Sequence, residues 1–179
     1  MKRNTRLVTL VTCALLIAIH IVLVRFCSIQ TTFLRISFGF IPMSLAGIMF
    51  GPWYSCAVAA LADLLGATIF PTGGAFWPGF TVVAAVNGLM YGLMYQRPGS
   101  KPSRARRLIQ IGLVVVLVNV VGNFVLGTIN LYVAYGAGAV ANIPLRAAKA
   151  VAMIPIEFII VTTLERVLVQ PLNRQLHRT

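Results

Sequence analysis

Long apolar segments recur along this chain, and they limit what it can fold into more than any other feature. The first runs from Leu7 to Phe26 and carries only one charged residue, an arginine next to its end. A segment of about 20 apolar residues matches the roughly 30 Å hydrocarbon core of a bilayer. In the whole chain, 59% of the residues are hydrophobic and only 10% are charged. The sequence therefore predicts an all-α integral membrane protein.

Turn-forming residues divide these segments into the helices of a single membrane domain, residues 1–179. Gly51-Pro52 and the glycine- and proline-rich segment 71–80 mark two of the breaks. The expected helices cover residues 7–26, 35–50, 53–70, 79–95, 108–131 and 142–169. The segment 96–107 is polar and rich in proline and arginine, so we expect it to be solvated. The predicted fold is a six-transmembrane-helix bundle.

The basic residues indicate how this bundle is oriented. With six spans, the amino terminus, the segment 96–107 and the carboxyl tail lie on one side of the membrane. These three segments hold most of the 15 lysines and arginines of the chain. By the positive-inside rule, both termini are therefore cytoplasmic. A nucleic-acid-binding domain gathers its basic residues on one solvent-facing surface, so the formal net charge of +12 does not indicate nucleic acid.

Motifs for catalysis or metal binding are missing from the sequence. It has no Walker loop, no HExxH and no credible Ser-His-Asp set, and its two histidines lie near opposite ends. Cys13, Cys27 and Cys56 lack metal-ligand spacing and are interpreted as small buried hydrophobic side chains. We expect no enzymatic activity, no metal and no cofactor. If the chain transports a solute actively, the energy comes from another protein.

Polar side chains at similar depth in four of the expected helices predict a binding site. At a rise of about 1.5 Å per residue, Asp63, Asn87 and Lys149 each lie about 10–12 Å below the outer ends of their helices. Arg146 is shallower and Asn123 a little deeper. An ionisable group inside a membrane costs about 2.5–3.5 kcal/mol and normally faces a cavity or a partner.

Two cations near one acid leave a positive surplus, which favours a pocket for an anionic, hydrogen-bonding, partly aromatic solute. A salt bridge from Asp63 to Lys149 or Arg146 that only fixes the bundle is the alternative. Arg25, Arg35, Phe76 and Trp77 lie near the outer mouth of the expected pocket. Each of these four is a candidate ligand contact, and each also suits an interfacial position.

Further polar residues are interpreted as structural. We interpret His20 as a packed core histidine, and Tyr91 and Tyr95 as members of the interfacial aromatic belt. Glu157 lies deeper than the other ionisable groups, and we interpret it as a partner for Lys149 or for backbone.

The first helix carries a small-xxx-small pair, Ala14 and Ala18. Small residues at this spacing let two helix backbones approach closely in lipid. The pattern leaves open whether the pair packs inside the bundle or against an external partner.

The motifs around Asp63 are those of a known family. The segment SFGFIPMSLAGIMFGPWYSCAVAALADLLG, the following FPTGGAFWPGFT and the preceding AxxxA helix resemble the S components of energy-coupling factor (ECF) vitamin transporters, in particular the folate-specific branch. The resemblance covers nearly the whole chain. It implies a prokaryotic, multi-pass cell-membrane protein that binds a vitamin from outside. Uptake is then powered by a coupling subunit, EcfT, and two ATP-binding subunits, EcfA and EcfA'.

The resemblance also implies roles for particular segments. Ala14 and Ala18 map to the helix face that docks on the coupling subunit, and residues 26–40 map to a gate over the substrate. If the vitamin is folate, Asp63 can accept two N–H groups of its pterin, aromatic residues such as Phe76 and Trp77 can stack on its rings, and cations can bind its glutamate. An S component for riboflavin, thiamine, or a queuosine or pterin precursor is one alternative, and a ligand-free membrane scaffold is another.

Overall fold

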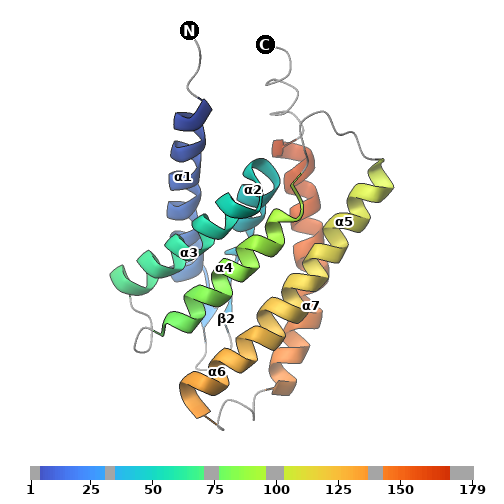
Figure 1. Ribbon diagram of the computed structural model, residues 1–179. Coiled ribbons are helices and arrows are strands. Elements are labelled where there is room, and N and C mark those ends of the chain that lie inside the picture. The colour runs from blue at the N-terminus through green and yellow to red at the C-terminus, as the bar shows by residue number, and fades with distance from the viewer. Residues whose placement is uncertain (1–4, 31–34, 71–76, 96–102, 137–142, 170–179) are drawn as a thin grey trace.

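The computed structural model describes residues 5–30, 35–70, 77–95, 103–136 and 143–169 (Figure 1). Its elements, in chain order, are α1 Thr5–Arg25, β1 Ile29–Gln30, β2 Arg35–Ile36, α2 Phe40–Phe50, α3 Pro52–Ile69, α4 Pro78–Gly92, α5 Arg104–Leu117, η1 Val118–Leu126, α6 Gly127–Tyr135, α7 Ile143–Leu164 and η3 Glu165–Val169. The segments η1 and η3 are π-helices.

The described part of the chain is a bundle of apolar helices, as predicted. Four helical runs are long and apolar enough to cross a membrane: Arg6–Arg25, Pro52–Ile69, Arg104–Tyr135 and Ile143–Val167. The helices α2 and α4, of 11 and 15 residues, are shorter. Six crossings therefore stay a prediction. The description all-α needs one small correction, because β1 and β2 form a two-stranded antiparallel sheet with Ile29 opposite Ile36.

The second helix begins later than predicted, at Phe40 rather than at residue 35. A helix from residue 35 would carry Pro42 in its interior, where the missing N–H and the ring disrupt the helix. Starting at Phe40 places Pro42 in the first turn, where backbone N–H groups have no partner within the helix. Arg35 and Ile36 instead pair with β1, so the chain forms a short hairpin between α1 and α2.

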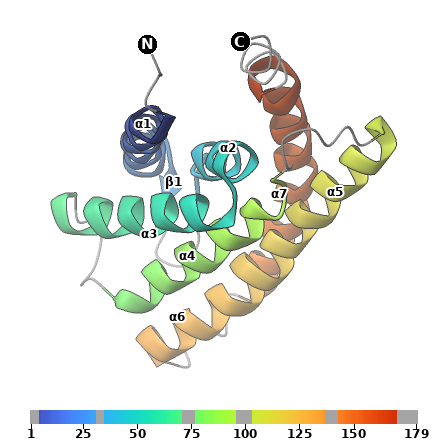
Figure 2. The same ribbon diagram turned by 45° about the horizontal axis from the view of Figure 1, so that its top comes forward.

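Glycines allow α3 and α4 to pack closely against each other. A Cβ atom on Gly88 would meet the backbone of Ser55, and one on Gly92 would overlap Pro52. Figures 1 and 2 show α4 lying between α3 on one side and the α5–α6 run on the other. The Gly88–Gly92 pair therefore packs inside the bundle, and it leaves α4 in a position to contribute side chains to the centre.

The fifth predicted helix is longer than expected and contains a π-helical segment. It starts at Arg104, because Ser103 caps it by accepting a hydrogen bond from the Arg106 N–H at 3.3 Å. The last residues of the segment predicted to be solvated therefore belong to α5, and Arg107 is buried. The π-helix η1 occupies the middle of the run, where wider helical turns change which side chains face the neighbouring helices.

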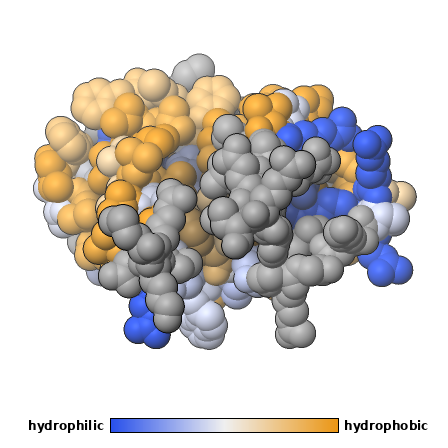
Figure 3. Space-filling model, turned by 90° about the horizontal axis from the view of Figure 1, so that it is seen from above, coloured by the Kyte–Doolittle hydropathy of each residue, from blue (hydrophilic) through white to orange (hydrophobic). Residues whose placement is uncertain are grey.

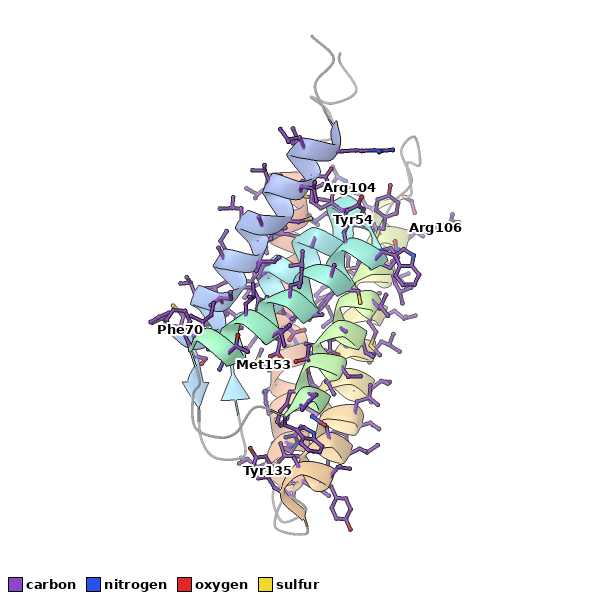
Figure 4. The ribbon with its side chains drawn as sticks, turned by 60° about the vertical axis from the view of Figure 1, so that its left-hand side comes forward. Tyr54, Phe70, Arg104, Arg106, Tyr135 and Met153 are labelled. Carbon is purple, nitrogen blue, oxygen red and sulfur yellow. The ribbon has the colours of Figure 1, made fainter. Side chains whose placement is uncertain are left out.

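One end of the bundle gathers the start of α1, the start of α5 and the end of α7 (Figure 1). Arg104 and Arg106 lie at this end, and Tyr135 lies at the opposite end (Figure 4). In the view from above, hydrophobic residues make up much of the visible described surface, and hydrophilic residues gather on the right-hand side (Figure 3). On α1, for example, Leu7, Leu10 and Leu15 are exposed. The cysteines follow the prediction only in part, since Cys13 is buried but Cys27 is exposed.

Candidate functional site

A cavity of about 180 Å³ lies within the bundle, and residues of α1, α2, α3, α4, η1 and α7 and of the segment just before α2 line it. Its lining residues are His20, Val24, Ser37, Gly39, Phe40, Met43, Asp63, Ala84, Asn87, Tyr91, Val118, Asn119, Asn123, Lys149, Met153 and Glu157. Figure 4 places Met153 about midway along the bundle. Four of the predicted site residues, Asp63, Asn87, Asn123 and Lys149, therefore meet at one cavity although they come from four different helices.

Asp63 lies on the cavity-facing side of α3, where small neighbours leave space around its carboxylate. Its Oδ2 accepts a hydrogen bond of 2.8 Å from the hydroxyl of Thr81 on α4. Arg25, at the end of α1, is close enough for attraction between its charge and that of Asp63. The Arg25 guanidinium packs over Gly66, where an added Cβ would lie 3.0 Å from Nε. Arg25 is therefore a neighbour of the site through Asp63, and it is not among the residues that line the cavity.

Asn87 and Asn123 connect α4 to the π-helix η1. Asn87 Nδ2 donates to Asn123 Oδ1 at 3.2 Å. This contact depends on Gly122, because a Cβ there would overlap the amide oxygen of Asn87. Both asparagines were predicted from the sequence as residues of the binding site. The sequence contained no indication of the π-helix that brings them together.

Glu157, Tyr91 and Asn119 form a buried hydrogen-bonded cluster on the cavity wall. The Tyr91 hydroxyl donates to Glu157 Oε2 at 3.0 Å, and Asn119 Nδ2 donates to the same oxygen at 2.8 Å. The interfacial position predicted for Tyr91 is wrong, since that side chain is only 1% exposed. Helical spacing could have indicated that Tyr91 and Glu157 face the site. Tyr91 follows Asn87 by one helical turn and Glu157 follows Lys149 by two turns, so each lies on the same helix face as a predicted site residue.

The two cations of α7 have different surroundings. Lys149 lines the cavity and is near enough to Glu157 for their charges to attract, as predicted. Arg146 instead reaches the run η1–α6: its Nη2 donates to the Asn123 carbonyl at 2.9 Å and its Nε to the Thr128 hydroxyl at 3.1 Å. Arg146 is thus bonded to the helix that carries Asn123, and it is not among the residues that line the cavity.

His20 is packed as predicted, but it also lines the cavity. Its Nδ1 lies 3.1 Å from the carbonyl oxygen of Gly39, and the side chain is buried. A Cβ on Gly39 would contact both His20 and Val24. The histidine therefore holds the segment before α2 against α1, next to the cavity.

The remaining candidates lie at the rim or outside the described residues. Trp77 lies just before α4 and is exposed, and its Nε1 donates to Asn130 Oδ1 at 2.9 Å. Phe76 lies outside the described residues, and so does the side chain of Arg35, of which only the backbone in β2 is described. Neither Trp77 nor Asn130 lines the cavity.

Ala14 and Ala18 lie on the outer face of α1 and are exposed. Exposed apolar residues surround them, including Leu10, Val11 and Leu15. This arrangement shows that the pair is not used for packing between the described helices, and it leaves the face open to lipid or to a partner.

The cavity is suited to binding rather than to catalysis or metal coordination. It presents two carboxylates, three side-chain amides, a lysine and a phenol among apolar residues. Within the described part of the chain, no three His, Cys, Asp or Glu side chains come together as metal ligands do. Apolar walls with a few convergent polar groups are typical of sites for small organic ligands.

Comparisons with known proteins agree with this description. Residues 8–169 match the family model described as "ECF transporter, substrate-specific component". The chain is 40% identical over 148 residues to the folate transporter FolT of Clostridium novyi (strain NT), covering 83% of this chain and 82% of that protein. It is also 40% identical over 119 residues to FolT of Leuconostoc mesenteroides, covering 66% of this chain and 62% of that protein.

A solved structure has a similar fold. It is described as the crystal structure of FolT bound with folic acid, and it superposes with a TM-score of 0.74 at 35% sequence identity. The superposition covers 87% of this chain and 90% of that one. The relatives are transporter components and not enzymes.

Proposed function

The chain belongs to the family of substrate-specific components of ECF transporters, and from this premise we propose that it binds folate from the outer side of the membrane for uptake. The relatives that share 35–40% of its residues are folate transporters, and one of them is described with folic acid bound. Identity at this level, over 83% of the chain for the Clostridium novyi relative and 87% for the solved structure, supports the same ligand.

The observation that carries the proposal is the convergence of Asp63, Asn87, Asn123 and Lys149 on one internal cavity. Folate presents N–H donors on its pterin, two aromatic rings and an anionic glutamate. A carboxylate can accept two neighbouring N–H groups of a pterin, as in bidentate pairs. Asp63 lines the cavity and its Oδ2 accepts from Thr81, and we assign the pterin to this carboxylate.

The anionic end of folate requires cations. We propose Lys149, which lines the cavity, as a partner of the glutamate. Arg25 lies beside Asp63, so we propose that it contacts the pterin end of the ligand or balances the charge of Asp63. Arg35 and Arg146 are further candidates near the same end of the bundle. Arg146 contacts Asn123 and Thr128, so ligand binding by Arg146 requires it to share these hydrogen bonds or give them up.

The ligand is expected to extend beyond the cavity. Sites for drug-sized molecules usually measure about 300–1,000 Å³, and this cavity, about 180 Å³, is smaller. Folate would place one end in the cavity and the other toward the outer surface. We propose that Trp77 and its neighbour Phe76 stack on the part that extends outward. Trp77 directly precedes α4 and is held by a hydrogen bond to Asn130 on α6.

The membrane arrangement follows from the same premise. We propose six crossings, with α2 and α4 as the short ones, and both termini in the cytoplasm. The end of the bundle that holds Arg104 and Arg106 is then the cytoplasmic one, in agreement with the positive-inside rule. The Tyr135 end faces outward.

The chain has no ATP-binding motif, so we infer that its energy comes from the coupling subunit EcfT and the ATP-binding subunits EcfA and EcfA'. The exposed face of α1 around Ala14 and Ala18 supports docking there, because small residues on an unoccupied helix face permit close approach of a partner helix.

The ligand that co-purifies with the protein tests the proposal. Protein extracted from a folate-replete host in mild detergent is denatured, and the released small molecules are identified by mass spectrometry. We expect a folate in near-equimolar amount. Riboflavin, thiamine or a queuosine precursor in its place would keep the family and overturn the substrate. A protein that retains none of these, and binds none when they are added, would favour a scaffold.

A further inference from the structure

Two exposed arginines at the start of α5 draw their counter-charges from outside the chain. Arg104 and Arg106 lie in the first turn of this helix, and both side chains are exposed. The whole chain has only three acidic side chains against 15 basic ones. All three acids are engaged within the bundle: Asp63 by Thr81, Glu157 by Tyr91 and Asn119, and Glu165 by Arg107. The anions that balance Arg104 and Arg106 therefore belong to the surroundings of the protein.

The start of α5 is joined to the start of α3 through the end of α4. Arg107 Nη1 donates to the Met94 carbonyl at 2.6 Å, which holds the end of α4 against α5. A Cβ on Gly92 would overlap Pro52, so the end of α4 also packs tightly against the start of α3. These three helix ends therefore adjoin at one end of the bundle.

Exposed aromatic side chains lie at this end together with the arginines. Trp53 and Tyr54 belong to the first turn of α3, and Tyr95 follows the end of α4. Trp53 is 77% exposed, the largest fraction among the large hydrophobic side chains of the described residues. Figure 4 shows Tyr54, Arg104 and Arg106 at the same end of the bundle. We call these five residues the basic–aromatic surface. Tryptophan, tyrosine and arginine together are typical of the headgroup level of a bilayer.

The helix α5 continues from this surface with an apolar face. Ile109, Leu113 and Val116 follow Arg106 by three, seven and ten residues, which places them on the same side of the helix, and all three are exposed. At about 1.5 Å per residue, the face extends about 15 Å from Arg106. This length equals half of the roughly 30 Å hydrocarbon core, which is one leaflet. An acyl chain can therefore lie along α5 while its headgroup remains beside Arg106.

We propose that the basic–aromatic surface binds the headgroup of an anionic phospholipid of the cytoplasmic leaflet. A guanidinium can donate two parallel N–H groups to phosphate oxygens, so Arg104 and Arg106 bind the phosphate. Trp53, Tyr54 and Tyr95 contact the glycerol region with their rings and polar tips. The choice of leaflet rests on the proposed membrane arrangement, whereas the surface itself does not depend on which vitamin is bound. The bound lipid holds the ends of α3, α4 and α5 at the headgroup level.

Native mass spectrometry of the full-length protein in mild detergent tests the proposal. The protein is titrated with palmitoyl-oleoyl phosphatidylglycerol, or with phosphatidylcholine that carries the same acyl chains, and the lipid-bound states are quantified. We expect the wild type to bind its first phosphatidylglycerol at least about tenfold more tightly than its first phosphatidylcholine. The double variant Arg104→Gln/Arg106→Gln should lose this preference, because the two phosphatidyl headgroups then differ little for the protein.

The matched control is Lys2→Gln/Arg3→Gln, which removes the same amount of charge at the amino terminus. We expect it to keep the preference for phosphatidylglycerol. Thermal unfolding shows that both double variants are folded, and both should bind folic acid as the wild type does. A wild type that prefers phosphatidylglycerol but binds no folic acid would contradict the proposed function and support the lipid surface.

Three results would overturn the inference. The first is equal affinity of the wild type for the two lipids. The second is the same loss of preference in both double variants, which would indicate attraction by net charge alone. The third is displacement of phosphatidylglycerol by an equal concentration of soluble glycerol phosphate, which would assign the surface to free phosphate compounds.

Discussion

Two buried glutamates lie about two turns apart on the last helical run of the chain, and their surroundings differ. Glu165 is 6% exposed and forms an ion pair with Arg107 at the start of α5. Arg107 Nη1 also donates to the Met94 carbonyl at 2.6 Å and to Gln110 at 3.1 Å. This group of contacts joins the end of α4, the start of α5 and η3 at one end of the bundle.

Glu157, in contrast, receives its two described hydrogen bonds from neutral side chains and lies on a cavity wall. The comparison shows that burial of a charge does not by itself identify a functional site. A buried carboxylate that is neutralised by a cation in a closed network stabilises the helix packing. At Glu157 the two described donors are neutral side chains, and the carboxylate lies next to a cavity.

The largest expected effect is the loss of stability on breaking the ion pair. Arg107→Met leaves Glu165 buried without its cation, and removal of one partner of a buried pair typically costs about 3–5 kcal/mol. Thermal unfolding of the purified protein measures the loss. The double variant Arg107→Met/Glu165→Leu should recover much of it, because no charge is left buried. If Arg107→Met unfolds at the wild-type temperature, the pair does not stabilise this end of the bundle.

The next effect concerns the cavity wall. Gly122→Ala places a Cβ against Asn87, so it should displace the amide, break its bond to Asn123 and destabilise the protein by about 1–3 kcal/mol. Folate affinity should fall as well. The matched control is Gly112→Ala on α5, whose Cβ would lie 3.5 Å from Phe158, an ordinary contact. If both variants behave alike, close contact at Gly122 is not what shapes the cavity.

A third variant changes affinity more than stability. Asp63→Asn removes the charge of the proposed pterin acceptor but keeps a side chain of the same shape. It should weaken folate binding by at least about 1.5 kcal/mol, the scale of one charge-assisted hydrogen bond. Equilibrium binding to the folded variant gives the value. The same affinity as the wild type would exclude Asp63 as the anchor of the pterin.

The smallest effect on binding is expected outside both regions. Ala14→Trp adds a large side chain to the exposed face of α1 and touches neither the cavity nor the ion pair. We expect folate affinity to be retained, while uptake and co-purification with the coupling subunit are lost. Assembly of the variant into an intact transporter would place the docking face elsewhere.

Much of the fold could be predicted because hydrophobic length and turn residues are local signals. The third helix was predicted as 53–70 and is observed as Pro52–Ile69. The position of Asp63 within that helix was enough to predict that it faces a cavity or a partner, since an acid among apolar residues needs one, and Asp63 does line the cavity. Asn87, Asn123 and Lys149 were found by the same reasoning about depth.

The parts that were missed depend on contacts between distant segments. The π-helix η1 changes the direction in which the side chains of Asn119 and Asn123 point, and no local sequence pattern predicts it. Tyr91 was assigned to the interface because tyrosine is common there, but Glu157 on a distant helix buries its hydroxyl. The hairpin before α2 was missed because two-residue strands carry no periodicity.

Titration of the purified wild-type protein with tritiated folic acid tests the central claim most directly. The account predicts saturable binding of one folic acid per chain, which excess unlabelled folic acid displaces and excess riboflavin or thiamine does not. Binding that does not saturate, or that riboflavin or thiamine abolishes, would contradict a folate site in this cavity.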